Sequence, residues 1–230
     1  MTTVQGALDR YAADVPYGRL AASFLEFERF PGDDPVLLLA EAAAAATGQN
    51  YVTGVRPTIE RFADAFVATD RATSFSALAA IDLEDPELIE AVGAQRKRHV
   101  LLEAAAVLAK RPEADDLEAL RSWAAEADVY AYEDDPIGAI SGVGPSTFQY
   151  LRMLAGVDTA KPDPELIELL EAVAEAADEP TLATTDRLRA VAACEWLAIV
   201  TSYRRLEIDR IAWWMFTDET ERERVVADSR

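Results

Sequence analysis

The chain has 230 residues, half of them hydrophobic, which suffices for a sizeable core in one large or two closely packed domains and excludes a disordered chain. Acidic residues number 42 and basic residues 22, giving a net charge of −20, and only three of the basic residues are lysines. A single cysteine, Cys194, excludes an intrachain disulfide and a four-cysteine iron–sulfur cluster. Its place in an apolar helical run predicts a buried small hydrophobic side chain.

The acidic composition affects which partners the chain is expected to bind. An acidic, Ala-rich and Lys-poor composition is typical of adaptation to a salt-rich cytoplasm, with a merely acidic mesophilic protein as the alternative. A DNA-binding protein is expected to carry a basic footprint, and the composition as a whole lacks one. In concentrated salt, however, counterion release contributes little to DNA affinity, so a basic surface would gain little there.

No targeting or membrane segment is expected. The N-terminus lacks a basic region followed by an apolar one, which argues against a signal peptide. The longest apolar run, 36–46, is too short to span a membrane and contains Glu41. We therefore expect a soluble, cytoplasmic protein that does not associate with membranes.

Helices are predicted almost throughout, because Pro and Gly punctuate the chain every 15 to 30 residues and no long run alternates with a two-residue period. Asp34 reads as an N-cap and Pro35 as the first residue of its helix. From Thr217 the chain is charged and predicted to be frayed. The expected helical segments are 1–30 (one or two helices), 36–47, 56–69, 74–81, 85–93, 96–110, 117–127, a first hairpin helix from the turn at 133–136, a second after Gly144, 164–177, 185–205 and 206–216.

A Gly142-Val143-Gly144 turn between two helical patterns is the most informative local feature. Pro145 suits the first turn of the helix that follows, and the glycines allow positive φ and a close backbone approach. The N–H groups of such a turn and helix start attract a phosphate, and its carbonyl groups can hold a monovalent cation. The alternative is a plain helix–helix turn.

This stretch resembles the helix-hairpin-helix of the HhH-GPD superfamily of DNA glycosylases, which includes endonuclease III and the adenine glycosylases. Ser146 stands at the family's lysine position, and Asp163 follows it by 17 positions in Lys161-Pro162-Asp163, within the spacing of the family's catalytic Asp. Gln49, after the helix that begins near Asp34, resembles the family's base-probing glutamine. The segment 93–98 resembles the Gly-x-x-x-x-basic run before the next family helix. The likeness covers roughly 35–170.

The resemblance implies an all-α, two-lobed fold. Its central helical domain would span 31–170, with the helix-hairpin-helix at about 136–156. A second helical lobe would combine 1–30 with 171–230. The DNA cleft would lie between the two lobes, and no cofactor is implied beyond the monovalent cation at the hairpin.

The resemblance implies that Asp163 is catalytic, either stabilising an oxocarbenium-like charge on the sugar or orienting the attacking water. The alternative is a helix N-cap, because Asp163-Pro-Glu-Leu-Ile-Glu repeats the hexapeptide that begins at Asp85. Ser146 cannot form the imine made by the family's lysine, so lyase activity is not expected, whereas the adenine glycosylases also carry a serine there. Otherwise Ser146 and Thr147 simply belong to the first turn of a helix.

The DNA-facing residues implied are Gly142, Val143, Gly144, Ser146, Thr147, Gln49, Arg96 and Arg98. Gln49 would enter the base stack as a wedge, or lie in a solvated loop with Asn50 and Tyr51. Arg96, Lys97, Arg98 and His99 form the densest basic cluster, which would contact phosphates or form a solvated helix start.

Other polar and aromatic residues limit the kinds of site that the chain can form. His99 is the only histidine, which excludes a multi-histidine metal site or a Ser-His triad. Trp196, Trp213 and Trp214, with Leu197, Ile211 and Met215, read as a core stripe, with an aromatic base pocket as the alternative.

Three departures from the family put catalysis in doubt more than the fold. Glu165 and Glu168 stand where a His and an Arg are common, and Pro164 replaces a small polar residue. Acidic groups beside the supposed site would repel phosphate. The first hypothesis is a monofunctional DNA glycosylase of base-excision repair. The second is an HhH-GPD-fold module without catalysis, for nucleic-acid or protein interaction, and the third is an unrelated helical protein.

Overall fold

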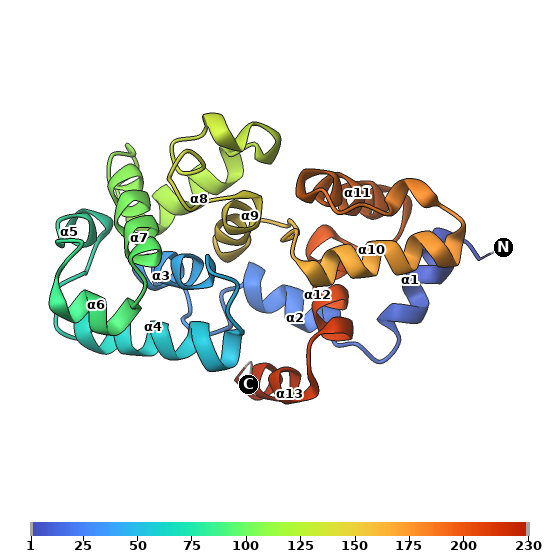
Figure 1. Ribbon diagram of the computed structural model, residues 1–230, viewed down its shortest axis with the longest axis horizontal. Coiled ribbons are helices and arrows are strands. Elements are labelled where there is room, and N and C mark those ends of the chain that lie inside the picture. The colour runs from blue at the N-terminus through green and yellow to red at the C-terminus, as the bar shows by residue number, and fades with distance from the viewer. Residues whose placement is uncertain (1, 229–230) are drawn as a thin grey trace. The chain divides into compact units, whose positions relative to one another are not determined.

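The computed structural model describes the backbone of residues 2–228 and the side chains of residues 2–225. Between residues 2 and 228 the regular structure is helical and no β-strand occurs, which confirms the predicted all-α class (Figure 1). None of these helices combines the length and apolar character that crossing a membrane requires.

The α-helices are α1 (Val4–Ala12), α2 (Tyr17–Leu25), α3 (Pro35–Ala45), α4 (Arg56–Phe62), α5 (Phe75–Ala79), α6 (Pro86–Val92), α7 (Gln95–Leu108), α8 (Asp116–Glu126), α9 (Pro145–Leu154), α10 (Pro164–Ala177), α11 (Arg187–Val200), α12 (Arg205–Phe216) and α13 (Glu219–Asp228). Shorter helical turns are the π-helical η1 (Tyr51–Val55) and η2 (Ala63–Val67) and the 3₁₀-helical η3 (Val129–Asp134) and η4 (Pro180–Leu182).

The chain divides into two compact units. The inserted unit is Pro31–Val157, and the terminal unit combines Met1–Phe30 with Asp158–Arg230. The two compact units meet at 30/31 and 157/158, and the domains expected from the sequence meet at 30/31 and 170/171. The difference lies in α10, whose Leu166, Leu169 and Leu170 are buried in the core of the terminal unit.

Helix α3 forms the centre of the inserted unit. Asp34 accepts hydrogen bonds from the N–H groups of Val36 (2.9 Å) and Leu37 (3.1 Å), and Pro35 is the first helical residue, both as predicted. The helix is buried from Val36 to Ala44 and packs against α4, α7 and α9. Burial includes Glu41, which is fully enclosed and accepts a 2.5 Å hydrogen bond from the Tyr150 hydroxyl of α9.

The loop expected around Tyr51 is helical instead. Helical structure runs from Tyr51 to Val67, with π turns at both ends of α4. The Asn50 side chain starts it by accepting from the N–H of Thr53 (3.0 Å). Pro57 has no N–H for an ordinary α-helical bond to the carbonyl of residue 53, which fits the widened turn before it.

Helix α7 differs from expectation on its first turn. The predicted inward residues Val100, Leu101, Ala104 and Leu108 are buried, whereas Val107 is half-buried. Lys97 and Arg98, expected on a solvated or DNA-facing surface, are also buried, with exposed fractions of 3% and 5%.

The predicted first helix of the helix-hairpin-helix is reduced to a single turn over residues 136–140. Asp135 accepts from the N–H groups of Ile137 (2.8 Å) and Gly138 (3.3 Å), which closes the chain tightly there. Gly138 lies so close to η3 that a Cβ would stand 1.8 Å from the Tyr132 carbonyl oxygen. The second helix, α9, forms as predicted and buries its Phe148 face.

The terminal unit packs α10 against α1, α11 and α12, and α2 against α12. Cys194 is fully buried there, as predicted, and burial raises the pKa of its thiol well above the ordinary value. Of the tail predicted to be frayed, residues 229–230 lie outside the described residues, and 219–228 form α13 instead. Asp218 accepts from the N–H of Glu221 (3.0 Å), and Arg222 donates to the Trp214 carbonyl (3.0 Å).

The predicted tryptophan core stripe is only partly buried. Leu197 and Ile211 are enclosed, whereas Trp196 and Met215 are each 39% exposed. Trp213 and Trp214 are half-buried. The prediction failed because Trp196 lies on the outer face of α11, whose inner face is already filled by residues such as Leu197.

Candidate functional site

The Gly-Val-Gly turn owes its shape to one glycine. Gly142 has φ +103°, whereas Gly144 is extended (φ −128°), so positive φ is required only at the first position. The Val143 N–H donates to the Ile140 carbonyl (2.9 Å), which uses one of the amides expected to face a phosphate. The turn leads directly into α9 at Pro145.

Arg96 holds this turn against α7. Its Nη2 donates to the Gly142 carbonyl (2.9 Å). A Cβ on Gly142 would meet Arg96 Nε at 3.0 Å and a Val100 methyl at 3.1 Å, so a larger residue there would require these side chains to shift. Arg96 itself is exposed, and the turn and the start of α7 therefore form one surface.

The first turn of α9 places the two hydroxyl residues differently. Ser146 is 8% exposed and lies in the core-facing side of the helix start, whereas Thr147 is half-buried. Both occupy the first turn of a helix, where N–H groups lack helical partners. The Ser146 side chain carries a hydroxyl group rather than an amine, so it cannot form an imine with a sugar.

Arg98 points inward rather than to a ligand. Its guanidinium donates to the carbonyl groups of Leu83 (2.9 Å) and Gly93, and it pairs with Glu84 (3.3 Å). The side chain thereby joins the chain on both sides of α6 to α7. A structural role accounts for these contacts.

Gln49 is exposed and directly follows Gly48, which turns the chain after α3 with φ +68°. Its Oε1 accepts a 2.7 Å hydrogen bond from the buried Lys97 ammonium. The N-terminal turn of α7 thus contacts the Gly142 turn through Arg96 and the Gln49 loop through Lys97. The structure brings these predicted residues together inside the inserted unit.

Asp163 belongs to the terminal unit and precedes α10. In the identical hexapeptide before α6, Asp85 accepts from the N–H groups of Glu87 (2.9 Å) and Leu88 (3.0 Å). Asp163 makes no such cap, and its Oδ2 pairs with Lys161 Nζ at 2.6 Å. The same six letters therefore use their aspartate in two different ways.

The reason lies in the residues around Asp163. Its N–H donates to the Lys161 carbonyl (2.8 Å), so Pro162 stands at the centre of a tight turn. The Lys161 N–H in turn donates to Asp209 of α12 (2.8 Å), which is 4% exposed and paired with Arg210. These contacts fix the backbone of the Lys-Pro-Asp turn to α12.

Asp209 and Arg210 were not among the predicted site residues. A signal was present, because Asp209 falls three residues after Leu206 and four before Trp213, on one face of the helix. An aspartate there is expected to hold a backbone or cationic partner. The Arg210 guanidinium also lies over the rings of Phe24 (5.0 Å) and Trp213 (5.5 Å).

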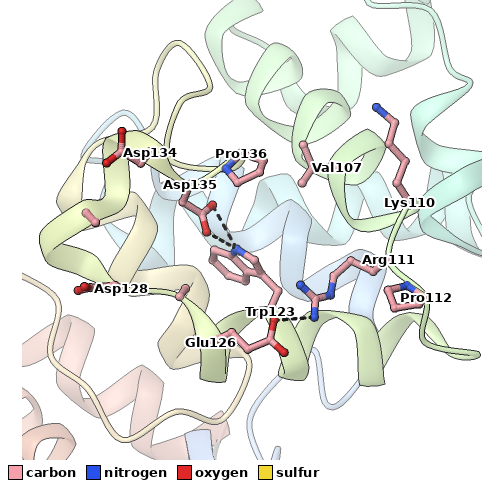
Figure 2. A pocket seen from close by; sticks show the side chains of 12 residues that line it. Val107, Lys110, Arg111, Pro112, Trp123, Glu126, Asp128, Asp134, Asp135 and Pro136 are labelled. Carbon is pink, nitrogen blue, oxygen red and sulfur yellow. Dashed lines mark hydrogen bonds and ion pairs between the residues drawn. The ribbon is translucent and has the colours of Figure 1, made fainter.

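A pocket of about 490 Å³ opens beside the C-terminal end of α7, α8 and η3 (Figure 2). Its Trp123 indole donates to both oxygens of Asp135 (3.2 and 3.1 Å), and Arg111 pairs with Glu126 (2.9 Å). The carboxylates that line it are Glu126, Asp128, Asp134 and Asp135. Their charge would repel phosphate, so this pocket is a poor candidate for DNA.

Metal ligation finds no support in the described side chains, since no group of three or more His, Cys, Asp or Glu residues there is arranged to hold an ion. The chain matches no family model, no curated protein and no solved structure in the comparisons with known proteins. The function must therefore be argued from the chain itself.

Proposed function

We propose that the chain is a monofunctional DNA glycosylase-like protein of base-excision repair, hydrolysing the N-glycosidic bond of a damaged or mismatched base. The observation that carries the proposal is the behaviour of Asp163. Its carboxylate is not used as a helix cap, although the identical hexapeptide at Asp85 caps its helix fully. A carboxylate that leaves the backbone N–H groups unused, and that is fixed on a tight turn, could act on a substrate once its ion pair with Lys161 opens.

The chemistry follows from charge. As the base leaves, positive charge develops on the sugar, and the side chain of Asp163 would stabilise it or orient the attacking water. Lys161 holds the carboxylate in place in the absence of DNA, at 2.6 Å. Ser146 offers no amine for an imine, so the reaction would end at base loss without strand cleavage.

DNA would be held by the inserted unit. Gly142, Val143, Gly144, Ser146 and Thr147 provide the turn and helix start, where a phosphate or a phosphate-bridging monovalent cation would bind. Arg96 lies on that turn, and Gln49 is exposed beside Lys97. Arg98 is left out of this surface, because its donors are occupied internally.

The alternative is a catalytically inactive HhH-GPD-fold module for nucleic-acid or protein interaction. It is favoured by the Lys161 ion pair, which neutralises the Asp163 carboxylate, and by Glu165 and Glu168 directly after it. The carboxylates of both glutamates would repel a nearby phosphate.

The test is abasic-site formation, detected as alkali-induced strand cleavage, on duplexes with deaminated, alkylated, oxidised or mismatched bases in molar KCl. Asp163→Asn is compared with Asp85→Asn, the same change in the same hexapeptide. We expect product from wild type and Asp85→Asn and none from Asp163→Asn. Equal product from both variants would place the chemistry elsewhere. No product from any protein, with duplex binding retained, would favour the non-catalytic module.

A further inference from the structure

Four arginines of the inserted unit are paired with carboxylates. The pairs are Arg56 with Glu60, Arg71 with Asp85 and Glu87, Arg98 with Glu84, and Arg111 with Glu113 and Glu126. Each of these arginines is therefore neutralised by a neighbouring acid.

Lys97 and Arg61 instead donate to neutral groups. Lys97, only 3% exposed, donates to the Gln49 amide oxygen at 2.7 Å. Arg61 donates to the Ala91 carbonyl (3.3 Å) and to the Thr58 hydroxyl (3.1 Å). All of these partners are neutral.

One short segment holds both cations. Gln49 lies against Gly54, where a Cβ would stand 2.8 Å from the Gln49 Cβ. The Thr58 hydroxyl donates to the Gly54 carbonyl (2.8 Å) and accepts from Arg61. Lys97 thus contacts one end of the 49–58 segment and Arg61 contacts the other.

The electrostatics of Lys97 and Arg61 favour an anion as the ligand of this segment. Burial, and then the positive charge of Arg61, lower the pKa of the Lys97 ammonium below its ordinary 10.5. A buried ammonium is costly without a compensating negative charge, and an anion beside it would stabilise both cations. Donors beyond these bonds remain on the Lys97 ammonium, on one guanidinium nitrogen of Arg61 and on the Gln49 amide nitrogen.

We propose that Lys97, Arg61 and the amide nitrogen of Gln49 form a binding site for a phosphate group. Tetrahedral phosphate oxygens accept several hydrogen bonds at once and match a site made of donors. The phosphate is either part of a nucleic-acid backbone or free in solution. This site goes beyond the proposed function, because it requires neither base excision nor Asp163.

Three variants test the site. Lys97→Met keeps the length of the side chain and removes a buried charge, so we expect it to fold. Arg61→Met removes the second cation from an exposed position. Lys110→Met, roughly 20 Å from Lys97 along the helix direction of α7, is the matched control for loss of one positive charge. Each folded protein is titrated with inorganic phosphate, against KCl of equal ionic strength, while its melting temperature is followed.

The second titration uses an undamaged duplex oligonucleotide at several KCl concentrations. For a backbone phosphate, Lys97→Met and Arg61→Met should each bind the duplex about tenfold more weakly than Lys110→Met. Their salt slopes should fall by about one unit, as for one lost phosphate contact. A phosphate-dependent rise in melting temperature, lost in the same two variants, would identify free phosphate as a ligand.

The proposal fails if both site variants match Lys110→Met in both titrations. It fails equally if wild type responds to neither phosphate nor duplex. Because the duplex is undamaged and Asp163 is unchanged, neither failure bears on base excision. Conversely, a phosphate response with no glycosylase product would leave the site standing and the proposed function refuted for the bases tested.

Discussion

The choice of residue at position 142 is set by backbone shape and by its neighbours. Gly142→Ala would place a side chain at φ +103° and against Arg96 and Val100, at 3.0–3.1 Å. We expect a loss of about 1–3 kcal/mol in the free energy of unfolding, measured by urea denaturation. Gly144→Ala is the control, because its φ is negative and nothing lies within 4 Å of a new Cβ. Equal losses in both variants would contradict this account of the turn.

Lys97 makes the stability of the protein depend on pH. Burial, together with Arg61, lowers the pKa of its ammonium in the folded state below 10.5. The folded protein therefore gives up this proton before the unfolded chain does, and wild-type stability gains as pH rises through that window towards 10.5. We expect Lys97→Met to be more stable than wild type at neutral pH, with the difference shrinking as pH rises. The measurement is the free energy of unfolding of both proteins across this pH range. A stability difference between Lys97→Met and wild type that stays constant or grows as pH rises would contradict the expectation.

At the scale of elements, the two copies of one hexapeptide provide a controlled comparison. Asp85→Ala removes a cap that accepts two backbone N–H groups, so we expect a loss of about 1 kcal/mol in unfolding free energy. Asp163→Ala removes a partly exposed ion pair and should cost less than about 1 kcal/mol.

The pH dependence of the Asp85 effect has a definite sign. The hydrogen bond from the Leu88 N–H, foremost, lowers the pKa of Asp85 below 3.8, so its stabilisation is present above that value and is lost as pH falls. Urea titrations of both variants at neutral and acid pH check the two expectations. A larger loss from Asp163→Ala would mean that Asp163 has a structural role that its contacts do not reveal.

The same comparison shows what local sequence can predict. The sequence alone predicts the helix starts at Asp34-Pro35 and Asp85-Pro86, because a cap depends on the next three residues alone. Asp163 departs from that rule through Lys161 and through Asp209, which lies 46 positions further along the chain. The shortened first hairpin helix depends similarly on the fit of Gly138 against Tyr132.

Of the site residues, sequence identified the Gly142 turn, Arg96 and Gln49, whose contacts meet at the start of α7. It did not distinguish Arg96 from Arg98, although one is exposed and the other buried. Positions two apart on a helix do not face each other, and which of them meets the core depends on the packing of α6. The role of Arg61 could not be predicted, because nothing local links it to Lys97.

At the scale of the whole molecule, net charge predicts a dependence on salt. A chain with a charge of −20 repels itself, and the repulsion weakens as ions screen it. The folding tests above therefore belong in molar KCl, where differences between variants reflect contacts rather than global repulsion.

The division into two units makes a prediction about fragments. Residues 31–157 contain their own core around α3, so this fragment should unfold cooperatively in urea. Extending it to residue 170, the boundary expected from the sequence, would expose Leu166, Leu169 and Leu170, which α10 buries in the terminal unit. Each such leucine represents about 1.5–3 kcal/mol of burial that the longer fragment cannot recover. We expect the longer fragment to bind more of a hydrophobic dye and to self-associate on gel filtration, whereas a longer fragment that folds alone better than the shorter one would place the boundary after α10 begins.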